Sequence, residues 1–318
     1  MRPTTHSRRA LLAGGLAGTG AALWPWTLVR AASAPAGAAG TITLGGDLTV
    51  NRLGFGAMRI TGPGIWGEPK DPAEARRVLH RALDLGVNFI DTADAYGPEV
   101  SERLIAETLY PYPRGLVIAT KGGLLRPSAP QWVPDGRPQH LREACEGSLR
   151  RLKLERIDLY QLHHVDPQVP IEESLGELAA LQKAGKIRHV GVSNFTVEQL
   201  SRAMRVVPVV SVQNRYNVGD RGSEDVLAMC AREKLAFIPW APLGSGSTER
   251  LEKADSGKGL EAVARARGVS VLQLAIAWLL AKSPAMLPIP GTSSVEHLQQ
   301  DLAAASLKLT PAELTQIG

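Results

Sequence analysis

Residues 87–122 read VNFIDTADAYGPEVSERLIAETLYPYPRGLVIATKG, and this stretch contains one complete strand–helix–strand unit. The runs 87–93 and 116–122 are short and rich in apolar and β-branched residues, which is typical of strands. Between them, residues 100–109 repeat apolar side chains at the 3.6-residue spacing of a helix. Two strands joined by a helix imply parallel pairing with a right-handed crossover. The stretch therefore predicts an α/β fold.

The same alternation continues on both sides of this stretch. We expect strands at 52–58, 87–93, 116–122, 157–163, 187–194, 209–217, 235–243 and 286–293, with helices at 72–85, 100–109, 141–152, 171–184, 197–206, 223–232 and 271–280. Eight strand-like units with no Pro/Ser-rich linker favour a single closed (β/α)8 barrel, or TIM barrel, over an open sheet. A turn at residues 44–47 predicts a short N-terminal β-hairpin, and 295–304 and 311–317 predict C-terminal helices.

The composition fits a globular protein that does not bind nucleic acid. Of the 318 residues, 44% are hydrophobic and 21% are charged, which excludes a disordered, collagen-like or coiled-coil chain. The net charge of +5 comes mostly from residues 1–40, which hold four arginines and no acidic residue. The rest of the chain is nearly neutral, so it lacks the basic footprint of a nucleic-acid-binding domain.

The N-terminal segment has the pattern of an export signal. Arg8 and Arg9 precede an apolar run over residues 10–29, and small residues follow at 31–38. This arrangement resembles a twin-arginine signal, which is read by an export receptor. We therefore expect residues 1–38 to be a signal segment, cleaved at about 31–38, and residues 39–318 to form the barrel, exported to the periplasm or outside and without a stable membrane span. The alternatives are an uncleaved anchor and a misassigned start, which would leave the protein cytoplasmic.

Polar residues stand at the carboxyl ends of three predicted strands. Asp91, Lys121 and His163 each end an otherwise apolar run. In a barrel these ends meet at one face, and strand alternation points Asp91 and Lys121 inward. A buried lysine and a buried aspartate must pair, because an isolated buried charge costs several kcal/mol. Tyr96 follows Asp91 in the next loop and can reach over the same opening.

These four side chains suggest carbonyl chemistry. A lysine kept charged by Asp91 would lower the pKa of the Tyr96 phenol from about 10, which suits a general acid. His163 can donate a hydrogen bond to a carbonyl oxygen and orient it, so that the carbonyl carbon can accept a hydride. The alternative is a structural ion pair beside an unrelated tyrosine and histidine.

The motifs around these residues resemble the aldo-keto reductase family. The resemblance is carried by FIDTADAYG at 89–97, ATK at 119–121 and DLYQLH at 158–163. It implies a barrel from about Thr41 to the C-terminus and a catalytic tetrad of Asp91, Tyr96, Lys121 and His163. Residues 44–58 with the 62–67 loop are similar to a bacterial branch that includes pyridoxal reductases. We expect His164 to point to the other side of its strand.

The resemblance also implies a nicotinamide cofactor, NADPH with NADH possible. The family's carboxamide-binding residues match Ser193, Asn194 and Gln213, and the residue that stacks on the nicotinamide ring matches Tyr216. A small-residue loop for the pyrophosphate matches Pro242, Leu243, Gly244 and Ser245. The adenosine segment matches Gly291, Thr292, Ser293, Ser294, His297, Gln300 and Asp301. Many members carry a cation in this last segment. Here hydroxyls and the predicted helix N-terminus at residue 295 would hold the 2′-phosphate, so we expect a weakened preference for NADPH.

Residues 62–67 read GPGIWG and match the dinucleotide fingerprint G-x-G-x-x-G by letter only. That fingerprint needs a helix opening at the turn, whereas Glu68 to Pro72 follow here. We instead expect this loop at the rim of the pocket, with Trp66 and Trp132 facing the substrate. The alternative is that both indoles only pack loops.

Three other functions of a barrel fold are alternatives to a reductase. A metal-dependent hydrolase needs clustered ligands, but the seven histidines form no HxH or HxxxH pair, so no metal site is predicted. A Schiff-base aldolase would use Lys121, but pairing with Asp91 makes that lysine a poor nucleophile. A non-catalytic NADP-binding or redox-sensing protein of the same fold is the main alternative. The sequence favours an NAD(P)H-dependent enzyme that reduces a small carbonyl compound, and Cys145 and Cys230 are expected to be core thiols.

Overall fold

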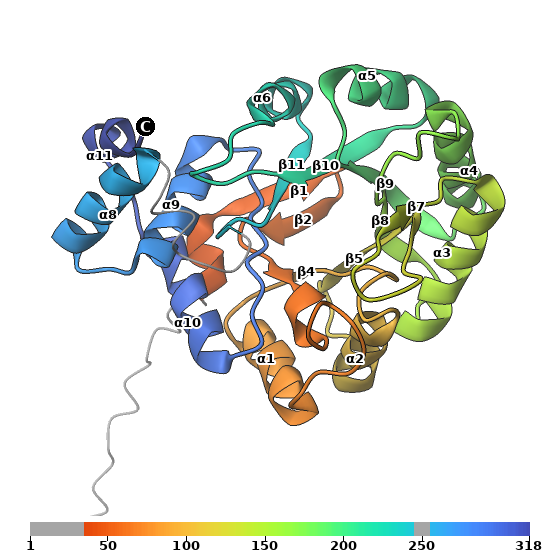
Figure 1. Cartoon of the computed structure of the whole chain (residues 1–318), viewed down its shortest axis with the longest axis horizontal. Helices are drawn as coiled ribbons and strands as arrows, with labels where there is room; N and C mark the ends of the chain where they lie inside the picture. The colour runs from red at the N-terminus through yellow and green to blue at the C-terminus, as the bar shows by residue number, and fades with distance from the viewer. Residues whose placement is uncertain (1–34, 245–254) are drawn as a thin grey trace, which may run out of the picture. The chain divides into compact units, whose positions relative to one another are not determined.

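A parallel sheet forms the centre of the computed structural model, which describes residues 35–244 and 255–318. The sheet contains seven strands in the order β11-β10-β9-β8-β5-β4-β3, and every neighbouring pair is parallel. The strands are β3 (Phe55–Gly56), β4 (Phe89–Asp91), β5 (Val117–Gly122), β8 (Ile157–Leu162), β9 (Ile187–Ser193), β10 (Val209–Arg215) and β11 (Ala236–Trp240). Figure 1 shows them curled around the middle of the molecule.

Residues 285–290 close the curled sheet into a barrel. They bond to β11 through Phe237 N to Ala285 O (2.8 Å) and Leu287 N to Phe237 O (2.9 Å), and to β3 through Gly54 N to Pro288 O (3.0 Å) and Gly56 N to Pro290 O (3.1 Å). This is where the sequence predicts the eighth strand. Two prolines lack the N–H groups that a regular ladder requires, so the segment pairs without forming a full strand. The (β/α)8 fold predicted from the sequence is confirmed.

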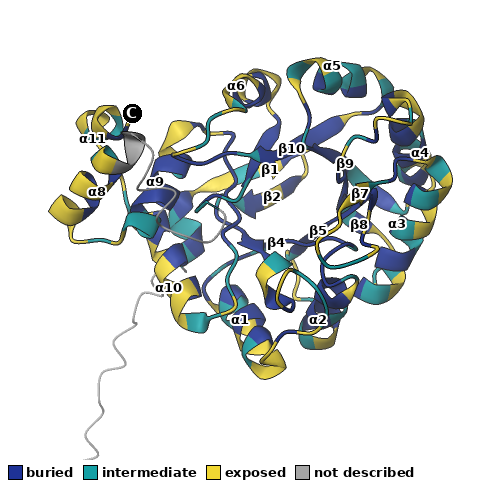
Figure 2. Cartoon of the chain, in the orientation of Figure 1, coloured by how far each residue is buried: buried dark blue, intermediate teal, exposed yellow. Residues whose placement is uncertain are grey.

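Helices surround the barrel and follow the strands in the chain (Figure 1). They are α1 (Pro72–Asp84), α2 (Val100–Leu109), α3 (Pro138–Leu152), α4 (Ile171–Lys183), α5 (Val197–Val206), α6 (Glu224–Glu233), α8 (Asp255–Arg267), α9 (Val271–Lys282), α10 (Val295–Ala303) and α11 (Pro311–Ile317), with short 3-10 turns η2 (Ala57–Ile60) and η3 (Ala304–Ser306). Their buried sides face the strands, and their exposed sides face outward (Figure 2). Side-chain caps fix several starts, as Asp71 does for α1 and Thr196 for α5.

The expected hairpin covers the amino end of the barrel. Strand β1 (Thr41–Leu44) pairs antiparallel with β2 (Leu48–Asn51). The apolar side chains of the hairpin join a cluster with residues that point into the barrel, including Phe89, Ala119 and Leu159. Apolar side chains therefore fill the amino end of the barrel. Polar groups can gather at the carboxyl end, where the loops that follow the strands can form a site.

The barrel unit begins earlier than the sequence suggested. The 3-10 turn η1 (Pro35–Ala39) packs Ala36 and Ala39 into the core beside α1, and Ala36 N donates to Leu85 O at 3.0 Å. Residues 35–38, assigned above to the signal segment, thus belong to the packed structure. The rest of that segment, residues 1–34, lies outside the described residues.

Within the described ranges, no single helix is long and apolar enough to cross a membrane. In the same residues, the helical segments 258–267 and 271–282 reach that length and apolar composition only when taken together, and the pair is bent by 106°.

Candidate active site

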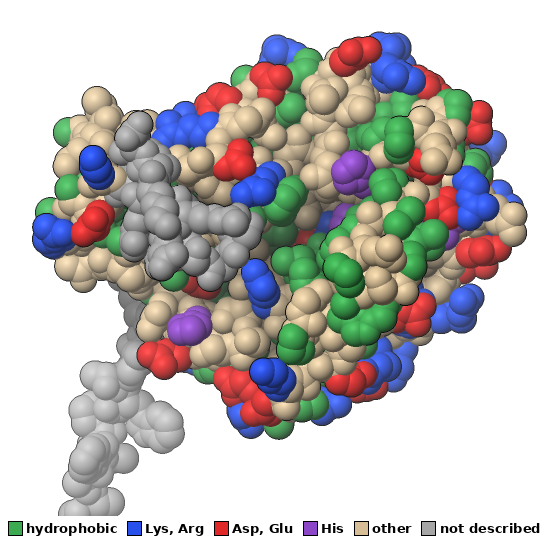
Figure 3. Space-filling model, in the orientation of Figure 1, with side chains coloured by type: hydrophobic (Ala, Val, Ile, Leu, Met, Phe, Trp, Pro, Cys, Tyr) green, Lys and Arg blue, Asp and Glu red, His purple; other side chains and the backbone are tan. Residues whose placement is uncertain are grey.

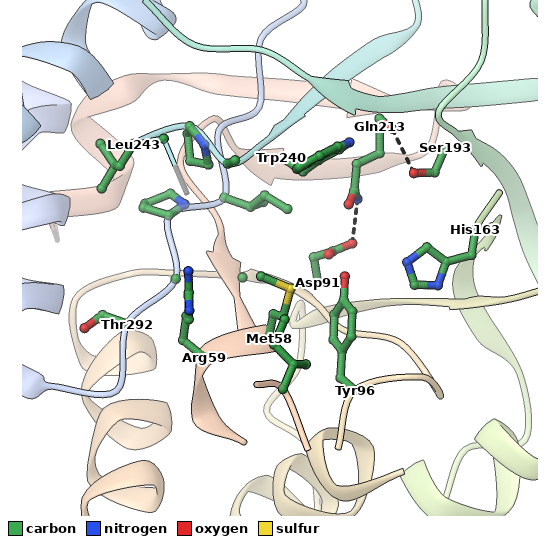
Figure 4. Close-up of a pocket in the computed structure, with 18 of the residues that line it drawn as sticks. Met58, Arg59, Asp91, Tyr96, His163, Ser193, Gln213, Trp240, Leu243 and Thr292 are labelled. Carbon is green, nitrogen blue, oxygen red and sulfur yellow. Dashed lines mark hydrogen bonds between the residues drawn. The ribbon is translucent and has the colours of Figure 1, made fainter. Parts of the chain in front are cut away.

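The four predicted catalytic residues meet at the carboxyl end of the barrel. Figure 4 shows Asp91, Tyr96 and His163 among them. Asp91 ends β4, Lys121 lies in β5 and His163 follows β8, while Tyr96 comes from the loop after β4. Lys121 Nζ donates to Asp91 Oδ1 at 2.6 Å, to the Thr92 carbonyl at 2.7 Å and to Tyr96 Oη at 3.3 Å. One ammonium group thus links the carboxylate to the phenol.

The second oxygen of the Asp91 carboxylate is also held. Asp91 Oδ2 accepts hydrogen bonds from Gln161 Nε2 at 3.1 Å and from Gln213 Nε2 at 2.9 Å. Gln161 was not predicted as a site residue. The sequence contains a signal for Gln161, because it lies two residues before His163 and therefore on the same side of a strand whose other residues are mostly apolar. Gln213 was predicted, and here its amide bonds to the catalytic carboxylate.

The charges of the buried pair follow from their contacts. Burial alone would lower the pKa of Lys121, but the Asp91 charge, the nearby Tyr96 and the hydrogen bonds to both raise it above its usual value. Lys121 therefore stays an ammonium ion at neutral pH, as the sequence predicted. A permanently charged lysine is a poor Schiff-base nucleophile, which weakens the aldolase alternative.

The pKa of Tyr96 shifts in the opposite direction to our expectation. Burial raises the phenol pKa above 10, and the attraction to Lys121 offsets only part of this effect. The prediction of a lowered pKa was wrong because it ignored desolvation, which disfavours the phenolate. The result is a phenol that keeps its proton at neutral pH.

His163 is buried and neutral beside this tyrosine. Burial, followed by repulsion from Lys121, lowers its pKa well below the usual 6.5. Its ring centroid lies 5.7 Å from that of Tyr96, and its Nδ1 has no partner in the described part of the chain. The neutral imidazole lines the cavity, so its ring can offer a hydrogen bond to a ligand's oxygen. His164 is exposed at the same cavity instead of pointing away from it, so that expectation was wrong.

A cavity of about 1170 Å³ opens above these residues. Figure 3 shows hydrophobic side chains gathered beside a central hollow, with histidine at its margin. Around the tetrad, the predicted carboxamide residues Ser193, Asn194 and Gln213 all line the cavity. Asn194 adopts φ 62°, a left-handed conformation that asparagine tolerates, and its side chain accepts a hydrogen bond from Trp240 Nε1 at 3.0 Å.

Tyr216 does not face the cavity. It is fully buried, its ring stacks on Trp278 at 6.0 Å and its hydroxyl donates to Glu224. Its assignment as the residue that stacks on nicotinamide is therefore corrected. Residues an odd number apart on a strand face opposite sides, so Tyr216 and Gln213 could not both point inward. Trp240, at the end of β11, supplies the aromatic wall instead, and Figure 4 shows it beside Gln213.

The loop after β11 forms the next part of the wall. Pro242, Leu243 and Gly244 line the cavity as expected. Ser245, predicted with them, lies outside the described residues.

The C-terminal segment lines the far end of the cavity with Gly291, Thr292, His297, Gln300 and Asp301. Burial raises the pKa of Asp301 to about 7. Ser293 and Ser294 are not among the lining residues, and Ser294 instead caps α10. At the start of α10, where the sequence predicts a phosphate contact, Val295 N donates to the Glu74 carboxylate at 3.0 Å, so this amide is already engaged.

A cation that the sequence analysis missed stands at this end. Arg59 lines the cavity and forms no ion pair or hydrogen bond within the described ranges. Figure 4 shows it beside Thr292. Arg59 reaches this end because β3 pairs with residues 288–290. The two segments lie so close that a Cβ atom at Gly291 would be 2.4 Å from the Gly56 carbonyl oxygen, which leaves no room for a side chain there. Arg59 is therefore a cation available at the end of the cavity that Gly291 lines.

The two predicted rim tryptophans have different places. Trp132 lines the cavity, whereas Trp66 does not and lies behind Arg126. The cavity as a whole offers amides and an aromatic face near Tyr96 and an arginine with a hydroxyl at its far end. This donor set fits a dinucleotide, with the nicotinamide near the tetrad and phosphate near Arg59.

In residues 35–244 and 255–318, no group of three or more His, Cys, Asp or Glu side chains is arranged to hold a metal ion.

Comparisons with known proteins identify the family of the chain. The aldo/keto reductase family profile matches residues 52–318. An uncharacterized oxidoreductase of Schizosaccharomyces pombe is 51% identical over 272 residues, 86% of this chain and 87% of that protein. Pyridoxine 4-dehydrogenase of Escherichia coli is 41% identical over 283 residues, 87% of this chain and 96% of that enzyme.

A solved relative extends the likeness to structure and cofactor. An aldo/keto reductase from Klebsiella pneumoniae, in complex with NADP and acetate, gives a TM-score of 0.71 at 26% identity and covers 87% of this chain and 93% of its own. The expectation of a nicotinamide cofactor is thus confirmed at the level of the family. This chain belongs to the aldo/keto reductase family of oxidoreductases.

Proposed function

We propose that this protein reduces an aldehyde or ketone to an alcohol with NADPH, and that Tyr96 is the general acid. The observation that carries the proposal is the contact of Lys121 Nζ with both the Asp91 carboxylate and the Tyr96 hydroxyl at the cavity floor. The bound nicotinamide would supply the hydride. The protein's own part is to orient the carbonyl and to deliver a proton to its oxygen.

Tyr96 is suited to hold that proton. Its raised pKa keeps the phenol protonated, and the adjacent ammonium stabilises the phenolate that forms when the proton leaves. Asp91 keeps Lys121 charged, and the two glutamine amides keep Asp91 in place. The neutral His163 ring can donate a hydrogen bond to the carbonyl oxygen and direct it toward Tyr96.

The walls near the tetrad favour a carbonyl with an apolar or aromatic substituent. Apolar and aromatic side chains dominate this part of the lining, namely Met58, Ile65, Leu124, Trp132 and Pro134. The likeness to pyridoxine 4-dehydrogenase makes pyridoxal a candidate. The test is a panel of aldehydes, ketones and pyridoxal, followed through loss of NADPH absorbance. Cofactor binding without turnover on any member would favour the non-catalytic alternative.

We expect NADPH to bind more tightly than NADH, but only by a few-fold. One exposed arginine and a hydroxyl face the far end of the cavity, and the amide at the start of α10 is already occupied by Glu74. Titration of protein fluorescence with each nucleotide measures the ratio. Arg59→Gln should bring the ratio closer to one, whereas Arg202→Gln on the outer helix α5 should leave it unchanged. Equal or tighter NADH binding by the unmodified protein would refute the preference.

We also propose that residues before Pro35 direct export by a twin-arginine route. Cleavage ahead of η1 would leave the packed residues 35–39 in the mature protein. Arg8→Lys combined with Arg9→Lys should leave the protein in the cytoplasm, because the receptor reads the arginine pair. Cell fractionation of both forms measures this. Finding the unmodified chain uncleaved and only in the cytoplasm would end the export proposal and leave the reductase proposal intact.

A further inference from the structure

Arg126 connects three loops at the rim of the cavity. It follows the short strand β6 (Leu124–Leu125), which pairs with β7 (Val133–Pro134), and only 8% of the residue is exposed. Its two terminal nitrogens donate to four carbonyl oxygens, those of Ile65 (3.1 Å), Ala95 (3.1 Å), Gly64 (3.3 Å) and Ala129 (2.5 Å). These carbonyls belong to the 62–67 loop, to the loop that carries Tyr96 and to the 126–132 loop.

The same guanidinium lies between two indoles. Its central carbon is 3.7 Å from the ring centroid of Trp132 and 5.4 Å from that of Trp66. Burial lowers the pKa of Arg126 below its usual value, but an arginine side chain remains charged. In the described part of the chain no carboxylate pairs with it, so carbonyl oxygens and ring faces offset its charge.

The terminal N–H groups of Arg126 are all engaged, so they are not free to bind a substrate. Each terminal nitrogen carries two N–H groups and donates to two carbonyl oxygens, whereas the buried Nε–H has no hydrogen-bond partner in the described part of the chain. These hydrogen bonds connect the three loops at the rim of the cavity to one another. Four hydrogen bonds to three loops restrict the guanidinium, and the guanidinium in turn restricts the indole stacked on it.

Trp132 packs against two of the catalytic residues. Its ring lies edge-on to Tyr96 at 6.3 Å and to His163 at 6.4 Å, and it lines the cavity. The indole is nevertheless 36% exposed and belongs to a loop with little regular structure. Its position over the proton donor therefore depends on the stack with Arg126.

We propose that Arg126 is a positioning residue that fixes Trp132 as a wall of the substrate pocket and so sets selectivity for bulky carbonyl compounds. The proposal rests on the carbonyl reduction proposed above. A large aromatic substrate should contact the fixed indole, whereas a small aldehyde should react at the tetrad without using it. Loss of Arg126 should therefore raise KM for the large substrate and leave kcat and the small substrate nearly unchanged.

The test compares Arg126→Met, Trp132→Ala and the double variant on an aromatic aldehyde and a small aliphatic aldehyde. We expect each single variant to raise KM for the aromatic aldehyde about fivefold, with kcat within about twofold. The double variant should show no further rise, because Arg126 acts through Trp132. Arg137→Met is the matched control, since Arg137 directly precedes α3, pairs with Asp135 and makes no stack with Trp132.

Two further measurements separate positioning from folding and from the proposed reaction. Arg126→Lys keeps the charge but loses the planar fork, so it should show the same selectivity change even if Arg126→Met folds poorly. The fluorescence of Trp132 is obtained as the difference between the unmodified protein and Trp132→Phe. Quenching of this fluorescence by acrylamide reports the exposure of the Trp132 indole and requires no turnover. We expect the quenching to increase in Arg126→Lys. Additive KM effects in the double variant, or equal loss for both substrates, would overturn the proposal. Absence of any turnover by the unmodified enzyme would count against the proposed function. In that case the quenching experiment still tests the positioning role, and unchanged quenching in Arg126→Lys would overturn it.

Discussion

Tyr96→Phe should lower kcat/KM for carbonyl reduction by about 10²- to 10⁴-fold while nucleotide binding stays near that of the unmodified protein. The substitution removes one hydroxyl, the group that lies 3.3 Å from Lys121 Nζ and that would protonate the carbonyl oxygen. The ring itself remains, so its packing against Trp132 and His163 is kept. Steady-state kinetics and a fluorescence titration with NADPH measure the two quantities on the same preparation.

Tyr110→Phe provides the control for this substitution. Tyr110 is 52% exposed at the end of α2 and does not line the cavity, so the same chemical change there should not alter turnover. Turnover near that of the unmodified enzyme in Tyr96→Phe would remove Tyr96 from the catalytic role, although the family assignment would stand. Loss of nucleotide binding in parallel with activity would show a structural defect instead.

Lys121→Met should abolish most activity and also destabilise the fold by about 3–5 kcal/mol. Lys121 is fully buried, and its removal leaves the Asp91 carboxylate without its countercharge inside the barrel. The phenol also loses the group that stabilises its deprotonated form. Denaturant unfolding measures the free energy of unfolding, and single-turnover kinetics measures the chemical step.

The double variant Asp91→Asn with Lys121→Met separates the two effects. It removes both charges, and Gln161 and Gln213 can still donate to the remaining amide oxygen. Stability should largely recover, because no buried charge is left unpaired, while activity should remain low because the phenol is still unassisted. Full activity in Lys121→Met would show that Lys121 is not needed for the proton transfer.

The order of the elements and the identity of the tetrad could be predicted from the sequence. Helices at 100–109, 197–206 and 311–317 begin and end at the predicted residues, and β5 and β8 differ by one residue at one end. Local periodicity and capping residues act within a few residues, so they are visible in one chain. Asp91, Lys121 and His163 were found because strand ends in a barrel meet whatever the loops do.

Some features were missed although they are local. Helix α8 (Asp255–Arg267) and the β6–β7 pair were not predicted. Trp240 lines the cavity and Tyr216 does not, and strand alternation alone accounts for this difference.

Other features depended on contacts between distant residues. Glu74 of α1 covers the start of α10, Arg59 reaches the cavity end because β3 pairs with residues 288–290, and Arg126 stacks on Trp132. The raised pKa of Tyr96 also required knowledge of its burial, which only packing sets. The sequence by itself determined a barrel with a lysine, an aspartate, a tyrosine and a histidine at one opening, because periodicity and strand polarity are properties of short segments. The tertiary structure alone decided which charges are free, which are covered and which phenol keeps its proton, because desolvation and long-range pairing arise only when distant segments pack together.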